Sequence, residues 1–145
     1  DVIRLLKRED LTEKYFDLLE QLSHTEFSLR VDDKLVDKTY SEYINEKNLY
    51  IYVYDSGEKI TGTVSVFIEP KILHYGSKVG HLEDLVIDQD FRQSGIGKEL
   101  INHCISFCKQ QNCYKISLSC SDNNVKYYQM FGFKKHENSM RKDLI

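Results

Sequence analysis

The chain has 145 residues, of which 41% are hydrophobic and 30% charged, and its formal net charge is −3. A chain of this size and mixture predicts one soluble globular domain, over residues 1–145, with a single hydrophobic core. The slightly acidic balance excludes the strongly basic surface of a nucleic-acid-binding protein, and no apolar run approaches the roughly 20 residues of a membrane-spanning helix.

The first half of the chain predicts two helices followed by an antiparallel hairpin. In order, the predicted elements are a strand over Val2–Leu6, a helix over Leu11–Leu22, a helix over Val36–Asn45, a strand over Leu49–Tyr54, a hairpin turn at Asp55–Glu58 and a returning strand over Lys59–Ile68. Thr12 is the candidate N-cap of the first helix, and Gly62 marks a bulge or a close approach in the last strand. In the second helix, Tyr40, Tyr43 and Ile44 are predicted to face the core.

The second half predicts a strand, a helix and a further strand, with short elements around them. In order these are a connecting segment over Lys71–Lys78 after Pro70, a strand over Val79–Asp88, a helix over Lys98–Gln111, a strand over Tyr114–Cys120, a short helix over Asn123–Phe131 and a final strand pair from Gly132 to Ile145. A strand–helix–strand crossover joins parallel strands, so the two strands around the long helix are predicted to be parallel. The whole order predicts an α/β fold whose first half is mostly antiparallel.

Four cysteines lie in the second half of the chain. Cys104 and Cys108 are four residues apart on the predicted helix, while Cys113 and Cys120 flank the strand that follows. These spacings are not those of zinc fingers or zinc ribbons. They predict reduced, buried thiols in a cytoplasmic protein and no metal site.

The stretch from Gly80 to Lys98 carries the strongest functional signal. A strand with Glu83 and Asp84 at its entry is followed by a loop with the spacing R-x-x-G-x-G, which begins at Arg92. Glycines allow a sharp turn whose N–H groups approach a ligand closely, and the following helix adds the positive end of its dipole. The loop therefore predicts a pyrophosphate site, although it matches neither the G-x-G-x-x-G of a Rossmann loop nor the G-x-x-x-x-G-K-[ST] of a Walker loop.

This loop and a second motif together resemble the GNAT N-acetyltransferase superfamily. The second motif is N-x-x-x-Y-x-x-x-G-F, from Asn124 to Phe133, with its tyrosine at Tyr128. The resemblance implies a GNAT fold, in which helices flank a mixed central sheet, and acetyl-CoA as the acetyl donor. It further implies a set of cofactor-binding residues: Leu85, Val86, Ile87, Arg92, Gln93, Ser94, Gly95, Ile96, Gly97, Lys98, Asn124 and Tyr128.

Three further segments resemble the eukaryotic glucosamine 6-phosphate N-acetyltransferase family. The matching segments are Gly80-His81-x-Glu83-Asp84, Lys71-x-x-His74 and Asn112-Cys113-Tyr114-Lys115-Ile116. The resemblance implies acetyl transfer to the amino group of this amino sugar phosphate, directly within a ternary complex, on the way to UDP-N-acetylglucosamine. It also implies a homodimer whose C-terminal strand crosses to the partner.

The same resemblance assigns roles to individual residues. Glu83 is predicted to accept the proton of the substrate ammonium, through a water molecule, and Asp84 to position the substrate. In a regular strand these neighbours point to opposite faces, so both reach one site only if a bulge intervenes. Tyr128 is predicted to hydrogen-bond the thioester sulfur. The substrate-binding candidates are Lys71, His74, Glu83, Asp84, Tyr114, Lys115 and Arg141, and no metal is implied.

One departure from the family leaves the identity of the base open. Family members often carry an acidic residue where this chain has Ser119, so either Glu83 acts alone or Asp122 approaches from the next loop. The resemblance also implies a substrate contact by an N-terminal serine or threonine, for which Ser23 and Thr25 are the candidates. Two other functions stay open: an acetyltransferase for another small amine or a protein N-terminus, and a non-catalytic acetyl-CoA sensor.

Overall fold

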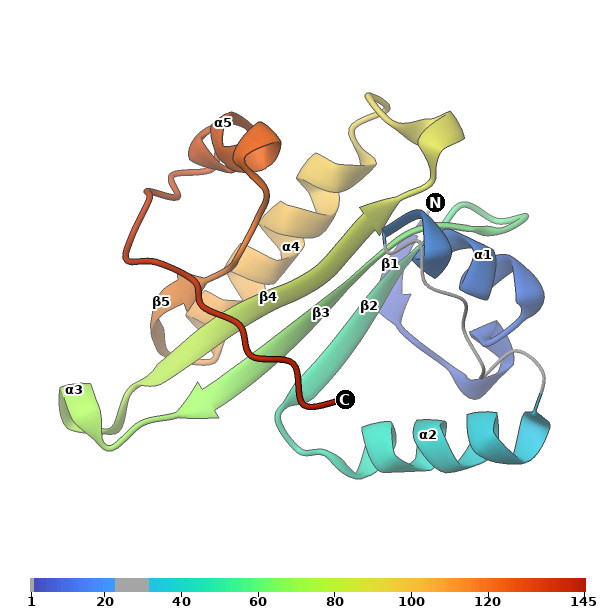
Figure 1. The fold of residues 1–145 in the computed structure, drawn as a ribbon, viewed down its shortest axis with the longest axis horizontal. Coiled ribbons are helices and arrows are strands. Elements are labelled where there is room, and N and C mark those ends of the chain that lie inside the picture. The colour runs from blue at the N-terminus through green and yellow to red at the C-terminus, as the bar shows by residue number, and fades with distance from the viewer. Residues whose placement is uncertain (1, 23–31) are drawn as a thin grey trace.

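Five strands form one mixed sheet through the centre of the protein (Figure 1). The computed structural model describes residues 2–22 and 32–145, so the candidates Ser23 and Thr25 lie outside the described residues. The strands are β1 (Val2–Leu5), β2 (Leu49–Asp55), β3 (Ile60–Pro70), β4 (Lys78–Ile87) and β5 (Cys113–Ser117), and they lie side by side in that order. Neighbours are antiparallel except β4 and β5, which are parallel. The predicted α/β fold and its parallel pair are confirmed.

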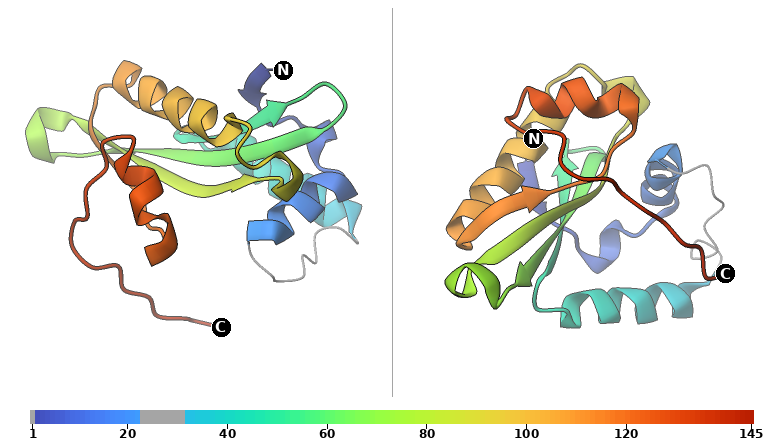
Figure 2. Two further views of the ribbon diagram at one scale, coloured as in Figure 1. Left: turned by 90° about the horizontal axis from the view of Figure 1, so that it is seen from above. Right: turned by 60° about the vertical axis from the view of Figure 1, so that its left-hand side comes forward.

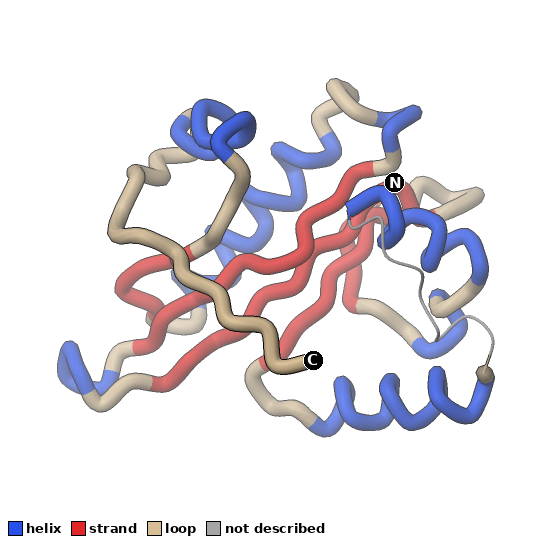
Figure 3. The backbone as a smooth tube through the Cα atoms, viewed as in Figure 1, coloured by secondary structure: helices blue, strands red, loops and turns tan. Residues whose placement is uncertain are grey.

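Helices and single 3-10 turns connect the strands (Figure 3). They are α1 (Glu13–Leu22), α2 (Asp33–Asn45), α3 (Leu73–Gly76), α4 (Ile96–Gln110) and α5 (Val125–Gln129), with the turns η1 (Arg8–Asp10), η3 (Gln89–Phe91) and η4 (Asp122–Asn124). α2 begins before the predicted Val36, because the Asp32 side chain caps it by accepting the N–H group of Lys34 at 3.0 Å. Ile44, predicted to face the core, is 56% exposed, because it lies beyond the inward stripe of this helix.

Helices lie on both faces of the sheet (Figure 2), and two separate hydrophobic cores hold them there. α4 packs on one side, here called the α4 face, through residues such as Leu100 and Cys104. α1 and α2 pack on the opposite side, here called the α1 face, through Phe16 and Val36. Both cores bury apolar side chains almost completely, and such burial contributes most of the stability of a domain this size.

Two glycines let α4 lie close to the sheet. A Cβ atom on Gly62 would stand 2.9 to 3.0 Å from three side chains, and one on Gly80 would stand 2.5 Å from Cys108 Sγ. The close approach predicted at Gly62 is confirmed. A bulge also lies beside it, where the β2–β3 register shifts between Tyr54 and Asp55.

Gly80→Ala is expected to destabilise the protein by about 1–3 kcal/mol, because the new methyl group overlaps the buried Cys108 sulfur. Removing that sulfur in Gly80→Ala/Cys108→Ala should recover most of the loss. A denaturant-unfolding cycle of the two single variants and the double variant measures this coupling. If the two substitutions change the free energy of unfolding additively, the contact between the new methyl group and the Cys108 sulfur is not the cause of the destabilisation.

The predicted strand pair at the C-terminus is wrong. Within the described residues no strand follows β5, which itself ends at Ser117 instead of Cys120, and residues 134–145 are exposed. This tail crosses the α1 face of the sheet after α5 (Figures 1 and 2). A strand needs a partner for its N–H and C=O groups, and the tail has none among the described strands.

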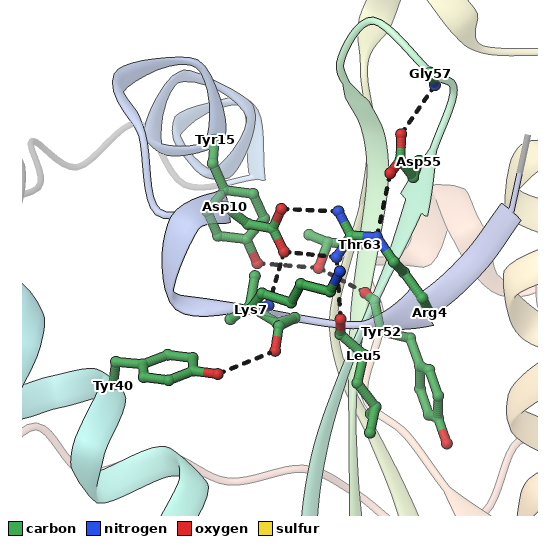
Figure 4. A network of polar contacts seen from close by, with 11 residues as sticks. Arg4, Leu5, Lys7, Asp10, Tyr15, Tyr40, Tyr52, Asp55, Gly57 and Thr63 are labelled. Atoms are coloured by element: carbon green, nitrogen blue, oxygen red, sulfur yellow. Dashed lines mark hydrogen bonds and ion pairs between the residues drawn. The ribbon is translucent and has the colours of Figure 1, made fainter.

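A charged network ties β1 to the segments around it (Figure 4). The Arg4 guanidinium binds Asp10 through two hydrogen bonds of 2.7 and 2.8 Å and reaches Asp55 at 3.2 Å. The Lys7 N–H group also donates to Asp10, at 2.7 Å. Burial opposes ionisation of Asp10, but these donors outweigh it and hold the pKa of the carboxyl below its usual value.

Asp10→Asn is expected to lower the free energy of unfolding at pH 7 by about 2 kcal/mol, because a charge-assisted pair is lost. A carboxyl whose pKa is depressed by folding stabilises the protein above its unfolded pKa of about 4, and that stabilisation disappears as pH falls through the folded pKa. The variant should therefore show a flatter stability curve below pH 5 than the wild type. Denaturant unfolding at several pH values measures both curves, and parallel curves would contradict this assignment.

Candidate active site

A β-bulge in β4 lies at the two carboxylates that the sequence singles out. Glu83 pairs with Ser65 of β3, and the next pair along joins Val86 to Thr63, so two residues of β4 oppose one residue of β3 between them. Asp84 sits in this bulge with a φ of 55°, in the left-handed region. A left-handed residue other than glycine is strained, and such strain concentrates at functional sites.

The bulge turns both carboxylates toward the α1 face. Asp84 and Ser65 line the same cavity on that face. Cross-strand partners share a face of the sheet, which places Glu83 there with Ser65. Both carboxylates are exposed. Glu83 and Asp84, although adjacent in the chain, can therefore face one site, because the strand has the bulge that this requires.

β4 has an open edge beside the bulge. Its pairing with β5 ends at His81 and Ser117, yet β4 continues to Ile87. The last residues of β4, including Leu85 and Val86, consequently have no strand partner on that side within the described residues. An edge of this kind offers main-chain hydrogen bonds to an extended ligand.

The open edge leads into the glycine loop and the start of α4. Gly95 has a φ of 91°, and a Cβ atom on it would meet nothing within 4 Å. No side chain caps α4. The N–H groups of Ile96, Gly97 and Lys98 have no acceptor in the described part of the chain. Free donors, the helix dipole and open space are the features with which helix N-termini bind anions.

The residues before Gly95 shape this loop through the main chain. Arg92 donates from Nε to the carbonyl oxygen of Ile87 at 3.2 Å, and the Ser94 hydroxyl contacts the carbonyl oxygen of Phe91. Gln93 is exposed, with a φ of 68°. The loop is therefore folded back on the end of β4, and its exposed residues face solvent at the start of α4.

α5 brings two tyrosines to this region. The Tyr127 hydroxyl oxygen lies 2.5 Å from the position that a Cβ atom would take on Gly97. The Tyr128 ring contacts the rings of Tyr127 and Phe133, with centroids 5.5 and 6.0 Å away. Burial raises the pKa of Tyr128 to about 12, so its phenol stays protonated at neutral pH and can donate a hydrogen bond. Asn124 is exposed directly before α5.

The predicted substrate cations gather at the other end of β4. His74 stacks on Tyr114, with ring centroids 4.0 Å apart, and the Lys115 Nζ atom lies 5.6 Å from the Tyr114 ring centre. Lys71 Nζ is 3.1 Å from Glu69 Oε2. These residues surround α3 and the start of β4, whereas the glycine loop follows the end of β4 (Figure 1).

Along β4 this cluster is set apart from the carboxylates. Lys115 pairs with Val79, and Glu83 stands four residues further along the strand, a separation of roughly 13 Å between these main-chain positions. Arg141 lies in the exposed tail, with its Nε atom 2.6 Å from Asp143 Oδ1. The structure thus separates the candidates into a β4 bulge, a cationic cluster and a tail.

The two residues that bear on the alternative base lie beyond β5. Ser119 is exposed and contacts Ser139, 3.5 Å away in the tail. Asp122 is exposed at the start of η4. In residues 2–22 and 32–145, no helix has the length and apolar character to cross a membrane, and no three His, Cys, Asp or Glu side chains are arranged to hold a metal ion.

Comparison with known proteins decides the family. The model of the acetyltransferase (GNAT) family matches residues 13–133. The chain belongs to this acetyltransferase family. The mixed five-stranded sheet with flanking helices is therefore a GNAT fold, as the two motifs predicted, and the enzyme class predicted from them is confirmed.

Relatives of this GNAT acetyltransferase share one activity name. Glucosamine 6-phosphate N-acetyltransferase of Arabidopsis thaliana is 33% identical over 143 residues, which cover 97% of this chain and 94% of that protein. A protein of the same name from Trypanosoma brucei brucei is 36% identical over 94 residues, covering 65% of this chain and 64% of that protein. The crystal structure of the Arabidopsis thaliana enzyme matches with a TM-score of 0.89 and 33% identity, over 99% of this chain and 98% of that chain.

The structure of the acetyltransferase shows a set of contacts at Asp88, behind the glycine loop, that sequence patterns did not predict. These contacts are called the Lys59–Asp88 brace here. Buried Asp88 accepts the N–H group of Asp90 and the Lys59 ammonium, each at 3.0 Å. Burial opposes ionisation of Asp88, but these donors outweigh it and hold its pKa below the usual value. Lys59 also lies 5.2 Å from the centre of the Phe91 ring. An Asp directly before a turn is a sequence signal for the contact between Asp88 and the Asp90 N–H group. No sequence pattern indicates the contact with Lys59, because Lys59 is far away in the chain.

Proposed function

We propose that this acetyltransferase moves the acetyl group of acetyl-CoA to the amino group of D-glucosamine 6-phosphate, giving N-acetyl-D-glucosamine 6-phosphate and CoA. The observation that carries the proposal is the bulge that sets Glu83 and Asp84 on one face beside the open edge of β4. The names of the relatives at 33% and 36% identity support the choice of acceptor. The product is a precursor for UDP-N-acetylglucosamine synthesis, which we place in the cytoplasm.

Acetyl-CoA fits the features at the end of β4. The pyrophosphate would occupy the loop from Arg92 to Lys98, where main-chain donors are free and Gly95 leaves open space. The pantetheine arm would pair with the edge of β4 over residues 85–87, as a ligand adds to an exposed strand. Asn124 and Tyr128 would then lie near the thioester end.

The transfer proceeds directly between the two bound substrates. Asp84 holds the ammonium group, and Glu83 removes a proton from it through a water molecule, which its exposure permits. The freed nitrogen lone pair forms the C–N bond at the thioester carbonyl, and the C–S bond breaks as the tetrahedral intermediate collapses. Tyr128 donates a hydrogen bond to the departing sulfur, because its raised pKa keeps the phenol protonated.

A homodimer accounts for the separation of the cationic cluster from the bulge. The cluster of Lys71, His74, Tyr114 and Lys115 lies toward the start of β4, roughly 13 Å along the strand from Glu83. In a homodimer these residues would serve the site together with a second copy. Arg141 in the unpaired tail would reach a partner in the same way. Some of the most exposed large apolar side chains of the described residues lie near α3 and in the tail: Ile72, Leu73, Tyr75, Met140, Leu144 and Ile145. Exposed apolar groups of this kind are common at subunit interfaces.

The test is CoA release from acetyl-CoA, followed by thiol titration, with glucosamine 6-phosphate or unphosphorylated glucosamine as acceptor. We expect rapid release with the phosphorylated sugar and release at least tenfold slower with glucosamine, since the cations then lack a partner. Equal rates would contradict a role for the cationic cluster. No release with either sugar, alongside clear acetyl-CoA binding, would refute the proposed acceptor.

A further inference from the structure

A cavity of about 170 Å³ lies between α1, α2 and the sheet. It is called the α1 cavity here. Its walls are mainly apolar, with Leu6, Phe16 and Val36 among the buried lining residues. Among the described residues that line it, Asp84 is the one charged residue. Of the same residues, Asp84 and Thr39 are exposed, so the cavity opens at the β4 bulge and beside α2.

The tyrosine hydroxyls around the α1 cavity are already paired. Tyr15 is hydrogen-bonded to Thr63 at 3.1 Å, and Thr63 in turn donates to a main-chain carbonyl at 2.8 Å (Figure 4). Tyr40 donates to a main-chain carbonyl at 3.4 Å, and Tyr43 accepts a main-chain N–H group at 3.1 Å. The interior therefore offers apolar contacts, and few hydrogen bonds remain for a polar ligand.

The chemistry of the α1 cavity selects one kind of acceptor. An apolar cavity of roughly 150 Å³ is large enough to bind benzene, so this one has room for a phenyl ring or a short alkyl chain. A carboxylate at its mouth attracts a cationic head group. A sugar phosphate placed inside would leave its hydroxyls and phosphate unpaired, which is costly, and it must lie outside, over the bulge.

We propose that the acetyltransferase also acetylates small primary amines that carry a phenyl or short alkyl group. The ammonium group binds Asp84, and the apolar group enters the α1 cavity. This activity rests on the acetyl-CoA site of the proposed function and is independent of its sugar-phosphate acceptor. The two acceptors share the position of the reacting nitrogen and extend in opposite directions from it, one into the cavity and one over the exposed face.

The step is the same acyl transfer. The ammonium loses one proton through water to Glu83, its nitrogen forms the amide bond with the acetyl carbon, and the C–S bond breaks to release CoA thiolate. The thiolate takes up a proton, so no oxidant or further reactant is required. The products are the N-acetylated amine and CoA.

The test compares benzylamine with glucosamine 6-phosphate as acceptors for acetyl-CoA, with N-acetylbenzylamine measured by chromatography. We expect saturable formation of this amide by the wild-type enzyme. Val36→Phe fills the α1 cavity and should lower kcat/KM for benzylamine by about tenfold or more, as pocket-filling changes do, while leaving the sugar phosphate reaction unchanged. The matched control is Ile44→Phe on the exposed side of α2, which should affect neither acceptor.

Val36→Ala makes the side chain smaller instead of larger, and it tests the proposed amine activity if Val36→Phe fails to fold. It enlarges the α1 cavity and should raise the preference for 4-phenylbutylamine over benzylamine. Isothermal titration of benzylamine into the protein gives a readout apart from catalysis, with binding expected to weaken in Val36→Phe.

The outcomes separate the two proposals. No N-acetylbenzylamine above the enzyme-free rate, together with normal acetylation of glucosamine 6-phosphate, would overturn the amine activity alone. Equal losses for both acceptors in Val36→Phe, or an unchanged amine preference in Val36→Ala, would also overturn it. Acetylation of benzylamine without acetylation of the sugar would support the amine activity and refute the proposed function.

Discussion

Glu83→Gln is expected to lower kcat for glucosamine 6-phosphate acetylation by about 10²- to 10⁴-fold, the usual contribution of a general base. Gln keeps the size of the side chain but cannot accept the proton of the ammonium group. Because Glu83 is exposed, the substitution should leave the fold and the KM for acetyl-CoA unchanged. Initial rates over a range of both substrates, with circular dichroism as the check on folding, measure these effects.

The matched control for this prediction is Asp122→Asn. Asp122 is an exposed carboxylate at η4 and is the alternative base. We expect near-normal turnover from this variant. Full activity in Glu83→Gln combined with a large loss in Asp122→Asn would reverse the assignment, and it would mean that the carboxylate lost at Ser119 is replaced from the following turn.

Gly97→Ala is expected to raise the KM for acetyl-CoA at least tenfold. Helix propensity alone favours alanine by about 1 kcal/mol, so a purely local effect would stabilise α4. The new Cβ atom would, however, lie 2.5 Å from the Tyr127 hydroxyl oxygen, and α5 would have to move away from the start of α4. Such a shift would disturb the Tyr128 side chain and the proposed anion site together.

Tyr127→Phe supplies the decisive second variant, because it removes the one oxygen atom in that contact. The double variant Gly97→Ala/Tyr127→Phe should return the KM for acetyl-CoA to within about threefold of the wild type, a difference below 1 kcal/mol. Tyr127→Phe alone should bind the cofactor normally. If the double variant stays as impaired as Gly97→Ala, the methyl group itself blocks the ligand, and the packing of α5 is not the cause.

Local patterns in the sequence determined the elements of this protein and the position of its loop. Strand and helix periodicity depends on residues two to four positions apart, and it correctly predicted β4, α4 and their parallel continuation in β5. The spacing of Arg92, Gly95 and Gly97 predicted a turn with open main-chain donors, and the structure has one. The helix cap at Asp32 was not predicted, because the apolar pattern of α2 begins only at Val36.

Only the tertiary structure decided how these parts combine into a candidate site. The bulge at Asp84 depends on how β4 pairs with β3, so no local pattern reveals that both carboxylates share a face. The α1 cavity depends on the packing of two helices on that face, and the Lys59–Asp88 brace joins residues 29 positions apart. The tail failed as a strand because a strand forms only where a partner satisfies its main-chain groups. The spacing of residues in the sequence was enough to identify candidate catalytic and binding residues. The distances between those residues, and the face of the sheet that they share, depend on contacts between segments far apart in the chain.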